Sequence, residues 1–178
     1  MNSSVLHNIL APVMTVIVMA GAASVKAESF SDDNRLYGTW IMESFQYDGE
    51  KVVNRQESGY TQIKYYGHDG EYACVEFYRT KPEDGGNIRV NVFPHEYGKP
   101  GYMLKNGMYT EMGRAPLKDA IVFTDKDTQR GRWGNRTDIW KRIKLPEKLL
   151  RHIVTTARIH QEVNSKEIQD ALMNNLMK

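Results

Sequence analysis

The chain has 178 residues, of which 24 are lysine or arginine and 22 are aspartate or glutamate, so its formal net charge at pH 7 is +2. This length suits one domain with a hydrophobic core and is short for two. So small a charge excess gives no electrostatic reason to expect a nucleic-acid partner or strong attraction to anionic membranes.

Residues 1–27 have the pattern of an export signal peptide. Residues 9–23 are almost wholly apolar, which suits an h-region and falls short of the roughly 20 residues of a spanning helix. Val25 and Ala27 stand at the −3 and −1 positions of a cleavage site before Glu28. An n-region without lysine or arginine leaves a retained membrane anchor as the alternative. Residues 28–35 are polar and predict a flexible leader.

The cysteine content agrees with export from a bacterial cell. Cys74 is the single cysteine, so no internal disulfide can form. An exported chain without disulfides is typical of bacterial periplasmic or secreted proteins. After signal cleavage we expect no stable membrane insertion.

Residues 36–144 show the alternation of apolar and polar side chains that is typical of β-strands. Strands are expected over residues 37–47, 60–66, 71–79, 87–93, 101–105, 108–112, 119–124 and 136–143, with 128–133 as a ninth. Short strands joined by tight turns, without helices between them, predict one antiparallel up-and-down sheet. Closure into a barrel would remove its exposed edges, and eight strands leave room for about one small ligand.

Residues 145–178 change to a helical period. The first predicted helix has one apolar face, made by Leu149, Leu150, Ile153, Val154 and Ala157. A second helix is expected to begin near Asn164 and to present Ile168, Leu172 and Leu176. We expect at least the first helix to pack on the outer wall of strand 37–47, whose Ile41, Phe45 and Tyr47 alternate with Trp40 and Met42. The alternative is a homodimer or a protein partner bound through these helices.

Two short motifs mark the two ends of the β region. Gly38-Thr39-Trp40 matches the Gly-x-Trp of the first strand of lipocalins, and residues 137–142 match the arginine-bearing last strand of many bacterial relatives. Over residues 36–144 the chain therefore resembles a bacterial, exported lipocalin-like (calycin-type) domain of unknown function. The resemblance implies a mainly β fold: a single antiparallel, up-and-down, lipocalin-like β-barrel of eight or nine strands, followed by a C-terminal helical segment.

In such a barrel the first and last strands are neighbours, which would bring Trp40 close to Arg142. A guanidinium stacked on an indole gains about 0.5–2 kcal/mol, and Gly38 would permit close approach of the backbone. We therefore assign Gly38, Trp40, Trp140 and Arg142 to barrel closure and not to ligand contact.

Candidate ligand contacts come from the tyrosines and from an arginine-rich segment. Tyrosine combines an apolar ring with a polar tip, which suits a wet binding cavity. Arg132 and Arg136 flank Trp133 and could clamp a carboxylate or phosphate, although a solvated hairpin would show the same pattern. The predicted ligand-binding residues are Tyr65, Phe77, Tyr78, Tyr109, Arg132 and Arg136.

The sequence shows no pattern of catalysis. His68-Asp69 and His95-Glu96 lack metal-ligand spacing, and no nucleophile motif such as Gly-x-Ser-x-Gly occurs. We expect no metal, no cofactor and no enzymatic activity. The favoured hypothesis is a binding protein for a small hydrophobic, amphipathic or anionic molecule. The alternative is an envelope protein-interaction module whose barrel is filled by side chains.

Overall fold

The computed structural model describes residues 29–79, 88–93, 100–158, 168 and 170–171. The predicted signal peptide, His95-Glu96 and most of the second predicted helix, including Asn164, Leu172 and Leu176, lie outside the described residues.

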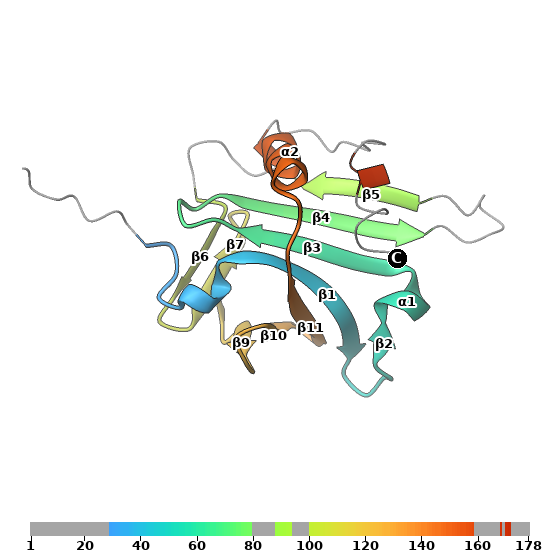
Figure 1. Cartoon of the computed structure of the whole chain (residues 1–178). Coiled ribbons are helices and arrows are strands. Elements are labelled where there is room, and N and C mark those ends of the chain that lie inside the picture. Colours follow the sequence, from blue (N-terminus) through green and yellow to red (C-terminus); the bar gives the residue numbers. More distant parts are fainter. Residues whose placement is uncertain (1–28, 80–87, 94–99, 159–167, 169, 172–178) are drawn as a thin grey trace, which may run out of the picture.

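The described strands form two antiparallel sheets (Figure 1). The larger sheet has the order β5-β4-β3-β1-β11-β10-β9, with β2 paired to one end of β1, and the smaller has the order β6-β7-β8. The strands are β1 (Gly38–Tyr47), β2 (Val53–Asn54), β3 (Tyr60–Tyr66), β4 (Tyr72–Arg79), β5 (Ile88–Phe93), β6 (Tyr102–Lys105), β7 (Met108–Glu111), β8 (Leu117–Lys118), β9 (Ile121–Phe123), β10 (Thr128–Trp133) and β11 (Arg136–Ile143). The helical elements are η1 (Asn34–Leu36), α1 (Arg55–Ser58) and α2 (Glu147–Arg158).

Each of the nine strand ranges expected from alternation contains a strand, including the ninth at residues 128–133. The predicted closed barrel is wrong. Among the described residues, β5 and β9 form the two edges of the larger sheet and do not pair with each other. The intervening β6 and β7 pair with one another across the Asn106-Gly107 turn and form a sheet of their own with β8. In the part of the chain that the structure describes, the antiparallel strands of the predicted fold are therefore present and its closure is not.

The first and last strands are neighbours, as predicted. β1 pairs antiparallel with β11, and Trp40 lies opposite Arg142 in the register. The Arg142 guanidinium carbon is 4.3 Å from the centroid of the Trp40 ring. Arg142 also donates hydrogen bonds to the carbonyl oxygens of Tyr37 and Arg35, at 2.6 Å each. These contacts connect the segment before β1 to the last strand. We call the paired strands and these contacts the β1–β11 seam.

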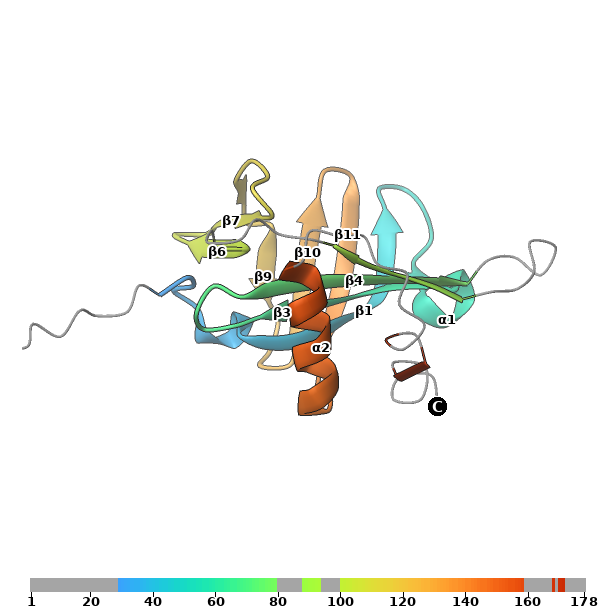
Figure 2. The same cartoon turned by 90° about the horizontal axis from the view of Figure 1, so that it is seen from above.

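A bend in β1 gives the larger sheet its curvature. Figures 1 and 2 show β1 turning along its length, so that β9, β10 and β11 lie on the side of β3 and β4 opposite α2. The β1–β11 register shifts between Met42 and Ser44, and such a bulge both bends a strand and reverses its alternation. Phe45 consequently packs with Trp40 and Met42, whereas alternation alone had placed it on the face of Ile41. That assignment of Phe45 was wrong because one extra residue inverts every following side chain.

Helix α2 covers the outer face of the sheet, which we define as the face that carries Ile41. It lies across β4 and β5 (Figure 2). The predicted apolar face of this helix is buried against the sheet, where Leu149, Ile153, Val154 and Ala157 pack with Ile41, Ile63, Ala73, Val75 and Phe77. Glu147 in the first turn suits the positive end of the helix dipole. Among the described helices, none is long and apolar enough to span a bilayer.

The inner face is the opposite face of the same sheet. It holds a second buried cluster that is rich in aromatic rings, among them Trp40, Tyr66, Tyr72, Tyr102, Tyr109 and Trp140. Tyr102 and Tyr109 come from β6 and β7, so the small sheet packs onto the inner face of the large one. Much of the inner side is therefore filled by side chains.

Replacing Gly38 by alanine should destabilise the seam more than the same change at Gly49. Both glycines have positive φ, 116° and 79°, so both variants carry backbone strain of about 1–3 kcal/mol. A Cβ atom at Gly38 would also lie 2.9 Å from Nη1 of Arg142, whereas one at Gly49 meets nothing within 4 Å. Urea unfolding of the two variants measures the difference. Equal losses of stability would show that Arg142 moves aside at no cost.

Candidate ligand-binding pocket

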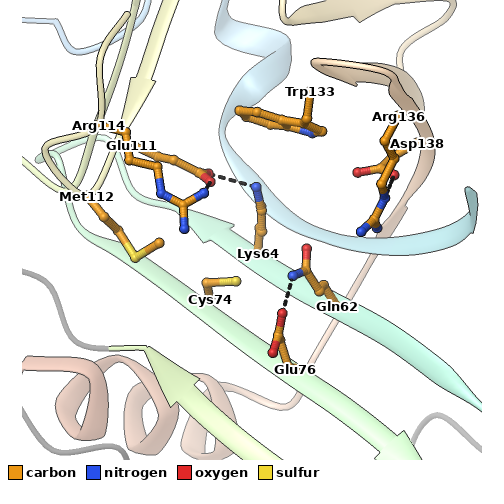
Figure 3. A pocket seen from close by; sticks show the side chains of 10 residues that line it. All are labelled: Gln62, Lys64, Cys74, Glu76, Glu111, Met112, Arg114, Trp133, Arg136 and Asp138. Atoms are coloured by element: carbon orange, nitrogen blue, oxygen red, sulfur yellow. Dashed lines mark hydrogen bonds and ion pairs between the residues drawn. The ribbon is translucent and has the colours of Figure 1, made fainter. Parts of the chain in front are cut away.

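A pocket of about 170 Å³ opens on the inner face. Its walls come from five parts of the chain: β3, β4, the end of β7 with the turn after it, β10 and β11 (Figure 3). The lining residues are Gln62, Lys64, Cys74, Glu76, Glu111, Met112, Arg114, Trp133, Arg136 and Asp138. Three are basic and three are acidic, so the pocket combines balanced charge with an indole wall.

Strand alternation explains why these side chains meet. Gln62 lies opposite Glu76 and Lys64 lies opposite Cys74 in the β3–β4 register, so all four share the inner face. The residues between them, Ile63 and Val75, face α2. In β3 and β4 the apolar side chains thus pack under the helix while their polar neighbours line the pocket.

A buried ion pair lies at the centre of the site. Nζ of Lys64 is 2.7 Å from Oε2 of Glu111, and each side chain is 4% exposed. The hydroxyls of Tyr72 and Tyr109 both donate to the same carboxylate oxygen, at 2.8 Å, and Tyr66 is hydrogen-bonded to Tyr109 at 2.9 Å. Three donors therefore converge on one carboxylate oxygen. Geometry of this kind compensates a buried charge that would otherwise be costly.

The network keeps Glu111 ionised. Burial acts to raise the pKa of Glu111, but the charge of Lys64 and the hydrogen bonds from Lys64, Tyr72 and Tyr109 outweigh it, so the pKa lies below its ordinary value. Because folding lowers this pKa, the ionised carboxylate stabilises the folded state at neutral pH. That contribution is lost as the pH falls through the lowered pKa.

Two indole rings hold the Lys64 ammonium group from the other side. Nζ lies 4.6 Å from the ring centroid of Trp133 and 5.0 Å from that of Trp140, within the range of a cation–π contact. Gly131 lies between the rings: a Cβ there would be 3.0 Å from Nε1 of Trp133 and 3.2 Å from Nε1 of Trp140. Because Gly131 has no side chain, both indole rings can pack close to its backbone.

A second ion pair lines the wall formed by β11. Nε of Arg136 donates to Oδ1 of Asp138 at 2.6 Å, and the guanidinium carbon is 4.8 Å from the centroid of the Phe45 ring. Burial raises the pKa of Asp138, while the charge and hydrogen bond of Arg136 oppose the increase. Packing and pairing therefore hold Arg136 in place.

Cys74 is chemically quiet. Its thiol is buried in the floor of the pocket, and burial raises its pKa to about 12. A thiol with so high a pKa stays protonated at neutral pH and is a poor nucleophile. In the part of the chain that the structure describes, no three His, Cys, Asp or Glu side chains gather so as to hold a metal ion.

The six predicted ligand-binding residues do not lie together in the structure. Arg136 lines the pocket. Tyr109 faces inward and supports Glu111 from behind, and Tyr78 lies partly buried on β4, on the face of Glu76 but outside the pocket lining. Tyr65 and Phe77 pack instead with the outer cluster under α2.

Arg132 also lies away from the pocket. It is exposed and forms a bidentate pair with Asp48, with Nη2 at 2.6 Å from Oδ2. The structure therefore does not bring Arg132 and Arg136 together. In the β10–β11 register Arg136 lies opposite Trp133, whereas Arg132 precedes Trp133 and lies opposite Thr137, so the two arginines are on opposite faces of the sheet. The four residues predicted for closure all lie at the β1–β11 seam or in the inner cluster beside it.

Sequence reasoning missed Gln62, Lys64, Glu76, Glu111 and Asp138. Each is a polar residue in a strand, and such residues usually face solvent. A signal was available in β3 and β4, where the residues that alternate with Gln62 and Glu76 are apolar and need a cover. The helix that supplies this cover leaves the polar face toward the interior.

Comparisons with known proteins find similar solved structures at low sequence identity. No protein-family model matches the chain, and no curated protein matches it. A solved lipocalin-like protein from Bacteroides uniformis is similar at 12% identity and a TM-score of 0.39, and covers 61% of this chain and 99% of its own. A solved uncharacterized protein from Bacteroides eggerthii is similar at 11% identity and a TM-score of 0.37, with the same coverage.

Proposed function

We propose that this protein binds a small anionic or amphipathic molecule in the inner-face pocket and performs no chemical step on it. The observation that carries the proposal is the convergence of ten side chains from five parts of the chain on one small space. Several of these side chains are already fixed by buried hydrogen bonds, as in the group around Glu111. A site fixed before binding loses little conformational entropy when it binds.

The size of the pocket limits the ligand. Pockets for drug-sized molecules have about 300–1,000 Å³, whereas this one has about 170 Å³. The ligand is therefore expected to be a small polar metabolite and not a retinoid-sized cargo. Export to the periplasm or the cell exterior, inferred from residues 1–27, would place the protein where such solutes are captured.

Native mass spectrometry of protein purified from its own host should reveal a small molecule that co-purifies, and that molecule should raise the melting temperature. A ligand at a hundred times its Kd stabilises the folded state by about 2.7 kcal/mol. A host-purified protein without ligand, together with a metabolite panel that leaves the melting temperature unchanged, would contradict the proposal. That result would favour the interaction module.

A matched pair of variants assigns binding to the pocket. Met112 lines it, whereas Met108 is exposed outside it. Met112→Trp should fill the space and weaken binding at least tenfold in calorimetry, and Met108→Trp should leave the affinity unchanged. Equal affinities for both variants would place the ligand elsewhere.

A further inference from the structure

Four of the six charged side chains in the pocket neutralise each other. Lys64 pairs with Glu111 at 2.7 Å, and Arg136 pairs with Asp138 at 2.6 Å. Both acids are buried, at 4% and 2% exposure of their side chains. Within each pair the two charges neutralise one another. A ligand would therefore gain little binding free energy by contacting a pair, and breaking one would cost much.

The other two charges are Glu76 and Arg114. Among the described residues, neither makes a hydrogen bond to a group of opposite charge. Glu76 accepts hydrogen bonds at Oε1 from the neutral groups of Tyr60 and Gln62, at 2.8 and 2.6 Å. Among the described residues it forms no ion pair. These bonds hold its carboxylate against the pocket wall.

Arg114 is the complementary group at the mouth. Its side chain is 66% exposed, and Nη1 lies 3.6 Å from Oε1 of Glu111, beyond hydrogen-bond distance. Glu111 already binds Lys64 and two tyrosines through its other oxygen, so Arg114 keeps most of its capacity to bind an anion. In the view of Figure 3, Lys64 and Cys74 lie between Arg114 and Glu76.

From this arrangement we propose that the ligand is a small zwitterion of the amino-acid class. Its ammonium group would bind the carboxylate of Glu76, and its carboxylate would bind the guanidinium of Arg114. The inference rests on the proposed binding function and names the class of ligand for the same pocket. Trp133 and Met112 supply apolar walls for the carbon chain between the two charges.

The arrangement also disfavours molecules with a single charge. A simple carboxylate gains Arg114 but leaves Glu76 without a counter-charge beside the ligand. A simple amine gains Glu76 but approaches the guanidinium of Arg114. Like charges at close range are costly, and this cost gives selectivity beyond the attraction itself.

Calorimetry with matched probes tests the inference on the full-length protein. The zwitterions are glycine, β-alanine, γ-aminobutyrate and ε-aminocaproate, which vary the distance between the charges. Butyrate and butylamine each lack one charge of γ-aminobutyrate, and acetate and methylamine do the same for glycine. At least one zwitterion should bind about tenfold or more tightly than its matched carboxylate and amine, as expected for one charge-assisted hydrogen bond.

Two charge-removing variants should abolish this preference separately. Glu76→Gln keeps an oxygen acceptor for Tyr60 and Gln62, so the fold is preserved, and it should reduce zwitterion affinity to that of the carboxylate alone. Arg114→Gln should reduce it to that of the amine alone. Glu43→Gln and Arg132→Gln remove the same charges outside the pocket and should leave affinity unchanged.

The outcomes separate this inference from the function on which it rests. Carboxylates or amines that bind as tightly as the zwitterions would overturn the inference, as would a preference that survives Glu76→Gln. A co-purified ligand of another class that Met112→Trp excludes would overturn the inference and support the proposed function. Absence of any ligand in the pocket would overturn both.

Discussion

Replacing Glu111 by alanine is expected to lower the free energy of unfolding by about 3–5 kcal/mol. The change leaves the buried ammonium group of Lys64 without its counter-ion and removes the acceptor of two tyrosine hydroxyls. Urea unfolding followed by tryptophan fluorescence and by circular dichroism measures the loss. A loss below about 1 kcal/mol, the range of exposed ion pairs, would mean that water reaches Lys64 in the folded state.

The double variant Lys64→Met with Glu111→Leu is the control for this prediction. Removing both charges together avoids the unpaired ion, and apolar replacements of buried pairs are often neutral or stabilising. We expect the double variant to be clearly more stable than Glu111→Ala. Asp48→Ala, which breaks an exposed pair with Arg132, should change stability little.

Replacing Trp40 by alanine should cost about 3–5 kcal/mol of unfolding free energy, as for other buried tryptophans. Trp40 is fully buried in the inner cluster. Its Nε1 donates to the carbonyl oxygen of Leu36 at 2.8 Å, and its ring carries the guanidinium of Arg142. Trp40→Ala therefore leaves a cavity in the inner cluster and removes both the hydrogen bond to Leu36 and the stacking contact with Arg142. Chemical denaturation measures the loss.

Comparison with Trp40→Phe and Arg142→Gln separates the contributions at the seam. Trp40→Phe keeps most of the ring volume but loses the hydrogen bond to Leu36. Its unfolding free energy should therefore fall less than that of Trp40→Ala. Arg142→Gln keeps the core packed and removes the stacking and the guanidinium bonds to Tyr37 and Arg35. If Trp40→Ala were no more destabilising than Arg142→Gln, the packing of the indole would not be the main source of stability here.

The buried network links the stability of the fold to the proposed binding site. Glu111 comes from β7 of the small sheet, whereas Lys64 comes from β3 of the large sheet. Their ion pair is therefore a bond between the two sheets as well as a part of the pocket. A variant that breaks it should lose stability and ligand affinity together, whereas Glu76→Gln and Arg114→Gln should lose affinity alone.

The local elements of this fold were predictable because their causes lie within short segments. The alternation in residues 60–66 and 136–143 marks strands whatever their partners, and β3 and β11 have these bounds. The apolar face of residues 149–157 likewise defines a helix. Even the long-range pairing of Trp40 with Arg142 was accessible, because the resemblance of two end motifs predicted it.

The inner and outer faces were not predictable from alternation. Both faces of β1, β3 and β4 carry apolar side chains, one set under α2 and the other in the inner cluster. Alternation could therefore not show that Tyr65 and Phe77 pack under α2 and away from the pocket. The bulge between Met42 and Ser44 adds to the difficulty, because nothing in the local sequence marks the extra residue that reverses Phe45.

The amino-acid sequence alone thus determined the antiparallel β character, the C-terminal amphipathic helix and the contact between first and last strands. Alternation, turn residues and helical period each depend on a few neighbouring residues, so they can be recognised in the sequence without the structure. Only the tertiary structure decided that the larger sheet is open over the described residues, which of its faces is inner, and that Glu111 of the small sheet meets Lys64. Those outcomes depend on how a bent strand and a covering helix place segments far apart in the chain, and single-strand patterns do not carry that information.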